Sequence, residues 1–112
     1  MIWRGDLHDV DLGRPVGHEP AFRRPAVVIS ADLLNHGPGG LVAVVPVGSA
    51  DHGLRSHVPL EPGAGTGLRR TSFARCDQLR FVASQRLSDR RGAVAREELM
   101  AIERALRFVL GL

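Results

Sequence analysis

Short apolar runs, separated by glycine- and proline-rich segments, occupy most of the chain. Residues 26–30 and 41–47 are apolar almost throughout, which predicts strands covered on both faces. Residues 5–12 end in alternation of polar and apolar side chains, which predicts a half-buried strand. Further short strands are expected at residues 57–60, 71–74 and 78–82.

Breaks between these runs predict turns. Pro46 cannot donate a ladder hydrogen bond, so it should mark a sheet edge, a bulge or a strand end. Residues 35–40 and 63–67 are rich in glycine and are expected to be loops or turns. Residues 75–77 are a possible bend between two strands, and residues 86–89 are expected to form a single helical turn.

The pattern changes to a helical period near the C-terminus. Apolar residues fall on one stripe, with charged residues mostly off it, which predicts an amphipathic helix of about 14 residues. Glu97 and Glu98 suit the positive end of the helix dipole, and Gly111 is a suitable stop. The stripe consists of Leu99, Ile102, Leu106, Val109 and Leu110.

These elements predict a mainly β fold with a C-terminal helix. Frequent turn signals between short strands favour a small β-barrel over an open sheet with crossover helices. The length of 112 residues fits one domain, residues 1–112. We expect the helix to cover part of the barrel or to form a dimer contact.

Composition narrows the chemistry. All 15 basic residues are arginine, and the formal net charge of +3 is compatible with an RNA or an acidic protein partner. Without lysine the chain has no nucleotide-binding P-loop, and its one cysteine, Cys76, allows neither an internal disulfide nor a cysteine metal cluster. The histidines lack metal-ligand spacing, so we expect no metal and no cofactor.

Targeting signals are absent from the sequence pattern. No apolar run approaches the roughly 20 residues of a membrane span. The N-terminal residues lack the apolar region of a signal peptide. We therefore expect a cytoplasmic protein that does not enter the membrane.

The segment 17–25 is the most suggestive local feature. A flexible, partly charged loop ends in Arg23, Arg24 and Pro25, and an apolar strand follows at once. This arrangement would place a guanidinium at the mouth of a sheet. Arginine suits an anion there because its planar fork matches phosphate and stays charged.

Several short motifs occur together and in order along nearly the whole chain. They are Arg4-Gly5-Asp6-Leu7, Val10-Asp11-Leu12, Gly17-x-Glu19, Arg24-Pro25-Ala26-Val27-Val28-Ile29-Ser30, Val45-Pro46-Val47, Asp77-Gln78-Leu79-Arg80 and Arg86-Leu87. Through these motifs the sequence resembles the MazF/PemK family of toxin endoribonucleases. The resemblance implies an SH3-like, CcdB/PemK-type β-barrel that forms a homodimer. It also implies metal-independent, sequence-specific cleavage of single-stranded RNA, and a cognate antitoxin whose acidic C-terminal segment lies across the RNA site.

The resemblance also assigns catalytic positions. The arginine before proline falls on Arg24, and the glutamate of the Gly-x-Glu loop falls on Glu19. Where the family usually has Thr or Ser this chain has Gly48, so Ser49 would supply the hydroxyl by a shift of one residue, or a different group does. Arginine essentially never deprotonates, so we expect Arg24 to stabilise charge on the phosphate rather than to act as a base.

Five further residues are predicted to contact RNA. Gln78 and Arg80 belong to the family-like Asp-Gln-Leu-Arg segment, and Arg23 and Arg55 offer phosphate contacts. His18 adjoins Glu19, and its imidazole is suited to proton transfer near neutral pH. The alternative for each is an exposed polar side chain without a role in the site.

Two other functions stay open at this point. One is a CcdB-like gyrase poison on the same barrel, although this chain ends in Leu-Gly-Leu instead of that family's Trp-Gly-Ile. The other is a non-catalytic barrel that binds RNA or protein, which the glycine at position 48 keeps possible.

Overall fold

Strands make up most of the chain in the computed structural model, which describes residues 1–19 and 22–112. The described strands are β1 (Asp6–Asp11), β2 (Arg23–Val28), β3 (Leu41–Gly48), β4 (His57–Leu60), β5 (Ser72–Arg75), β6 (Arg80–Ala83) and β7 (Leu87–Ala93). The helices are α1 (Asp32–Asn35), α2 (Arg96–Leu110) and two short 3₁₀ turns, η1 (Cys76–Gln78) and η2 (Ser84–Arg86). No helix in this part of the chain is both long and apolar enough to span a bilayer.

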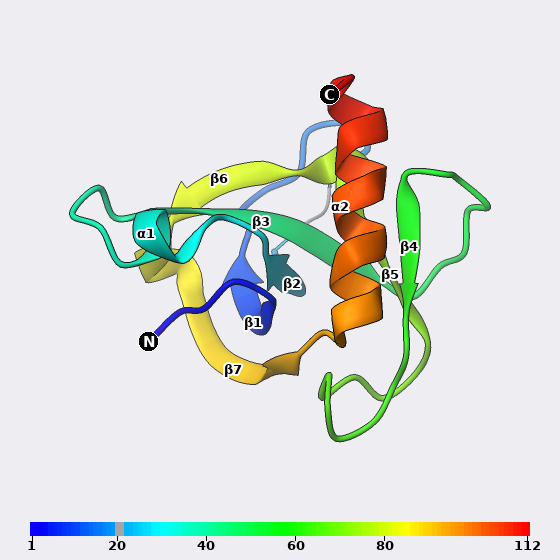
Figure 1. The fold of residues 1–112 in the computed structure, drawn as a ribbon, viewed down its shortest axis with the longest axis horizontal. Helices are drawn as coiled ribbons and strands as arrows, with labels where there is room; N and C mark the ends of the chain where they lie inside the picture. Colours follow the sequence, from blue (N-terminus) through cyan, green and yellow to red (C-terminus); the bar gives the residue numbers. More distant parts are fainter. Residues whose placement is uncertain (20–21) are drawn as a thin grey trace.

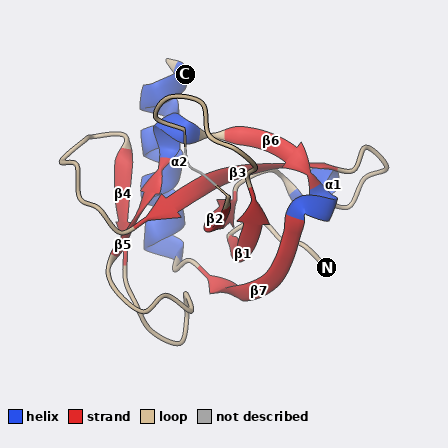
Figure 2. Cartoon of the chain, turned by 180° about the vertical axis from the view of Figure 1, so that it is seen from behind, coloured by secondary structure: helices blue, strands red, loops and turns tan. Residues whose placement is uncertain are grey.

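The strands form one antiparallel sheet in the order β4-β5-β3-β2-β1-β7, with β6 paired to β3. Helix α2 lies beside β4 and β5, and β6 and β7 curve round on the other side (Figure 1). The reverse view shows β1, β2 and β3 enclosed between these two parts (Figure 2). The predicted fold, a small β-barrel with a C-terminal helix, is confirmed.

The central strands are buried on both faces, as their apolar runs predict. Val27 and Val45 belong to a core that includes Ile102 of α2, whereas Val28 and Val44 belong to a second core within the curl of the sheet. Burying one such side chain stabilises the fold by roughly 1.5–3 kcal/mol. Two separate cores therefore fix the sheet from both sides.

Pro46 lies within β3 rather than at its end. It faces Ala26 of β2, and it separates the part of β3 that pairs with β6, up to Val44, from the part that pairs with β5, from Val47. The proline therefore lies where the strand paired to this edge of β3 changes from β6 to β5. Its missing donor is accommodated at that break in the pairing.

Helix α2 matches the predicted ends and most of the predicted stripe, but Leu110, which was expected on the stripe, is 53% exposed. Ile102 is fully buried, and the Glu98 carboxylate accepts a hydrogen bond from the Ala95 amide at 2.7 Å. Gly111 ends the helix with a φ of 71°, the left-handed conformation that glycine adopts without strain.

Several predicted boundaries were wrong. Residues 86–89 are not a helical turn: η2 ends at Arg86, and β7 begins at Leu87. Strand β7 exposes most of its side chains and is held by backbone pairing with β1, so its hydropathy pattern gave no strand signal. Strand β2 begins at Arg23, so both arginines of the loop segment belong to a strand. Residues 20 and 21 of that segment lie outside the described residues.

Candidate functional site

Two hollows adjoin each other near the end of β3. The larger, here called the arginine hollow, has a volume of about 550 Å³. Its lining residues are Arg24, Pro25, Val47, Gly48, Ser49, Leu68, Arg69, Arg70, Ser72 and Arg91. The smaller, the histidine hollow, has about 260 Å³ and is lined by His18, His52, Leu54, His57, Arg75, Asp77 and Gln78.

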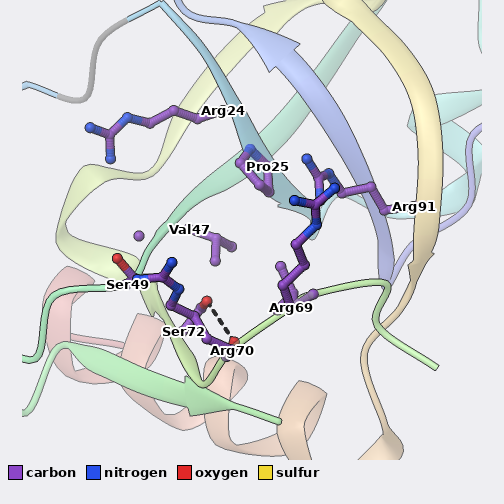
Figure 3. A pocket seen from close by; sticks show the side chains of 10 residues that line it. Arg24, Pro25, Val47, Ser49, Arg69, Arg70, Ser72 and Arg91 are labelled. Carbon is purple, nitrogen blue, oxygen red and sulfur yellow. Dashed lines mark hydrogen bonds between the residues drawn. The ribbon is translucent and has the colours of Figure 1, made fainter. Parts of the chain in front are cut away.

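The arginine hollow is strongly cationic. Four of its lining residues are arginines, and no carboxylate is among its described lining (Figure 3). Arg91 pairs with Asp9 at 2.6 Å, from Nε to Oδ1. The ion pairs found among the described residues include neither Arg24, Arg69 nor Arg70. Three guanidinium charges are therefore left to attract an anion.

Strands β2 and β7 each contain two consecutive arginines, of which only one lines the arginine hollow. Successive side chains of a strand point to opposite faces, so Arg24 and Arg91 line the hollow while their neighbours do not. Arg23 donates a hydrogen bond to the Ser88 hydroxyl, and Arg90 pairs with Asp6 at 3.2 Å. The neighbours secure the strands, and Arg24 and Arg91 are left facing the same space.

A glycine-rich turn brings the other two arginines to the hollow. The amide of Ala93 in β7 donates to the carbonyl of Gly65 at 2.9 Å. A β-carbon on Gly92 would lie 2.7 Å from the backbone carbon of Thr66, so the turn packs directly on β7. Arg69 and Arg70 follow this turn, and they reach the hollow opposite Arg24 (Figure 3).

The structure unites two of the three predicted catalytic residues. Ser49 is exposed directly after β3 and lines the same hollow as Arg24. Glu19 is exposed, and its Oε1 accepts a hydrogen bond from the Val16 amide at 2.8 Å. Glu19 forms none of the ion pairs found in the described chain, so it is not paired with Arg24 in this structure.

The five residues predicted to contact RNA do not lie together in one hollow. His18 and Gln78 meet in the histidine hollow. Arg80 is half-buried and donates to the carbonyl of Leu12 at 3.3 Å. Arg55 lies over the Phe108 ring of α2, 4.3 Å from its centroid, in a third hollow. The RNA contacts of all five, Arg23 included, stay predictions.

The sequence pattern also left several hollow residues unassigned. Arg69, Arg70 and Arg91 line the arginine hollow, and they belong to two of the three Arg-Arg doublets in the chain. The recurrence of that doublet was the available signal. His57, with a side chain only 5% exposed, lies 3.0 Å from Asp77 in the histidine hollow, and no sequence motif marked this pair.

Thiol chemistry does not belong to this site. Cys76 is fully buried, and its burial, with a smaller contribution from Asp77, raises the pKa of the thiol to about 12. The thiol therefore stays protonated at neutral pH and is a weak nucleophile. Among residues 1–19 and 22–112, no group of three or more His, Cys, Asp or Glu side chains is arranged to hold a metal ion.

Comparison with known proteins assigns this arrangement to a family. Residues 3–110 match the family model of the PemK-like, MazF-like toxin of type II toxin–antitoxin systems. The chain belongs to this family. Endoribonuclease MazF9 of Mycobacterium tuberculosis is 34% identical over 116 residues, which cover 100% of this chain and 98% of that protein.

Solved structures share the fold. The crystal structure of MazF from Deinococcus radiodurans is 26% identical, has a TM-score of 0.84, and is matched over 99% of this chain and 97% of that one. A mycobacterial endoribonuclease in complex with its cognate antitoxin has a TM-score of 0.80 at 22% identity, over 100% of this chain and 97% of that one. The predicted family and enzyme class, a toxin endoribonuclease, are confirmed.

Proposed function

We propose that the protein cleaves single-stranded RNA at the arginine hollow, without a metal ion. The observation that carries this proposal is the gathering of four arginines around one space with no carboxylate in its described lining. Such a space attracts a phosphate backbone, and guanidinium groups offer it paired hydrogen bonds. The names of the relatives support the reaction class.

RNA supplies the nucleophile for this reaction. The 2′-hydroxyl attacks the adjacent phosphorus, negative charge grows on the phosphoryl oxygens, and the 5′-oxygen leaves with a proton. The products are a 2′,3′-cyclic phosphate and a 5′-hydroxyl. The protein must align these atoms, stabilise the charge and move two protons.

Arg24 is suited to stabilising the phosphoryl oxygens. Its side chain is half-buried, which limits solvent screening, and the ion pairs found in the described chain do not neutralise it. Ser49 offers a hydroxyl in the same hollow to orient a phosphate oxygen. Glu19 would first give up its hydrogen bond from the Val16 amide. Its carboxylate would then bind the 2′-hydroxyl of the RNA and accept its proton.

The histidine hollow would receive nucleotides next to the cleaved bond. His18 and Gln78 line it, and their polar side chains can contact the edges of unstacked bases. Arg23, Arg55 and Arg80 would add phosphate contacts outside the arginine hollow, and His18 could also assist in proton transfer. Because these contacts are spread over several elements, RNA sequence choice would depend on more than one of them.

We further propose a homodimer in the cytoplasm that is controlled by a cognate antitoxin. An acidic C-terminal segment of that partner would lie across the arginine hollow, because its carboxylates can pair with the guanidinium groups that phosphates would otherwise meet. One of the structural neighbours is a complex of an endoribonuclease with its cognate antitoxin, which supports this type of partner.

The direct experiment incubates the purified protein with a long single-stranded RNA in excess EDTA and maps the new ends. We expect discrete cuts with 5′-hydroxyl ends. The same RNA with 2′-deoxy sugars at the cut positions should resist cleavage, because it lacks the nucleophile. Intact RNA under these conditions would contradict the proposal, and inhibition of gyrase supercoiling instead would favour the gyrase-poison alternative.

A further inference from the structure

Arg75, at the end of β5, lies between the two hollows. Its guanidinium covers Gly48, which lines the arginine hollow, and the Arg75 side chain itself lines the histidine hollow. The position follows from sheet register, because Gly48 faces Phe73 and Arg75 is two residues further along the same face of β5.

This approach is possible only because residue 48 has no side chain. A β-carbon built on Gly48 would lie 2.6 Å from Cζ and 2.9 Å from Nε of Arg75, closer than real contacts allow. The arginine therefore occupies the space that a side chain at position 48 would fill. Gly48 and Arg75 form a complementary pair, in which the glycine leaves room for the guanidinium.

The guanidinium is held there weakly. Nε of Arg75 is buried and has no hydrogen-bond partner within the described chain, and Arg75 takes part in none of the ion pairs found there. The nearby carboxylate of Asp77 is engaged with His57 at 3.0 Å. A buried donor without a hydrogen-bond partner destabilises the fold. A small rotation of the Arg75 side chain would let this donor bind a phosphate oxygen, which would remove that cost.

We propose that Arg75 binds an RNA phosphate next to the one held at Arg24, and that Gly48 is needed for it to do so. This inference rests on the RNA-cleaving function proposed above. Arg75 would connect the two hollows into one track for the RNA backbone, because it is the one arginine in the described lining of the histidine hollow and it also covers Gly48 of the arginine hollow. The substrate class it serves is single-stranded RNA with a phosphate on each side of the junction.

The test measures binding of a short RNA made uncleavable by a 2′-deoxy sugar at the mapped cut site. Its dissociation constant is determined at several salt concentrations. One lost phosphate contact should reduce the slope of log K against log salt by about 0.7 for a single strand. We expect Arg75→Gln to show this smaller slope and about tenfold weaker binding. Arg107→Gln removes the same charge from an exposed position on α2 and should match the wild type.

Gly48→Ala provides a second test that keeps the charge. It should displace the guanidinium and weaken binding, whereas adding Gly48→Ala to Arg75→Ala should cause no further loss. Thermal unfolding establishes that each variant is folded. A wild-type slope and affinity in Arg75→Gln, with an RNA-cleaving wild type, would overturn this inference alone. A wild type that neither binds nor cleaves RNA would overturn the proposed function and this inference with it.

Discussion

Arg24 and Ser49 show how single residues are placed for phosphate chemistry. Arg24 comes from β2 and Ser49 follows β3, and both line one hollow because the two strands are paired neighbours. The guanidinium supplies charge, and the hydroxyl can donate a directed hydrogen bond. The two side chains offer different things to a phosphate, because arginine carries a fixed positive charge and serine offers an uncharged hydroxyl.

Replacement of the hydroxyl tests the assignment at position 49. We expect Ser49→Ala to lower the cleavage rate by roughly 10²–10³, the effect of losing one well-placed donor. Ser84→Ala, which removes a hydroxyl from η2, serves as the control and should cleave like the wild type. Rates are measured in single turnover at saturating protein. Wild-type activity of Ser49→Ala would show that the Ser49 hydroxyl has no catalytic role. The polar group beside Gly48 would then be the guanidinium of Arg75.

The sequence located Arg24 because a doublet before proline and an apolar run is a local pattern. The arginine-before-proline motif also singled out Arg24 from Arg23, and the strand that begins at Arg23 explains why Arg24 is the one that lines the hollow. The sequence could not find Arg75 over Gly48, because that contact depends on the register of β3 against β5. Local patterns located the apolar strands and helix α2 but missed the exposed strand β7, whereas cross-strand geometry determined the site.

At the scale of elements, the glycine-rich turn 63–67 and β7 act as one support for the hollow. Gly67 has a φ of 73°, and a β-carbon on it would lie 2.9 Å from the carbonyl carbon of Arg91. The turn is further fixed by the Thr66 hydroxyl, which donates to the carbonyl of Glu61 at 2.7 Å. Close backbone packing here holds Arg69 and Arg91 on adjoining segments.

A small added side chain should therefore disturb this support. We expect Gly92→Ala to destabilise the protein by roughly 1–3 kcal/mol, because the atoms it meets are backbone atoms that no rotamer change can move. RNA binding should weaken as well, as the turn carrying Arg69 shifts. Urea unfolding and the RNA dissociation constant measure the two effects.

Gly39→Ala is the matched control for this change, since a β-carbon there meets no atom within 4 Å. It should leave both the unfolding midpoint and the RNA affinity close to those of the wild type. An unfolding midpoint for Gly92→Ala that equals the control would contradict the role assigned to the turn.

At the scale of the whole molecule, charge is distributed unevenly. The formal net charge is only +3, yet four arginines from β2, β7 and the segment before β5 surround one hollow. Acidic residues elsewhere pair with other arginines, as Glu103 does with Arg4 at 2.7 Å and Asp6 with Arg90 at 3.2 Å. A modest total charge therefore coexists with a strongly cationic site.

The central claim is that the charge of Arg24 stabilises the RNA phosphate during cleavage. Its most direct test compares wild type, Arg24→Ala and Arg107→Ala in single-turnover cleavage of one RNA at saturating protein in EDTA. The account predicts that Arg24→Ala cleaves at least about 100-fold more slowly, the effect of losing one charge-stabilising donor, while Arg107→Ala keeps the wild-type rate. Cleavage by Arg24→Ala at the wild-type rate would contradict it.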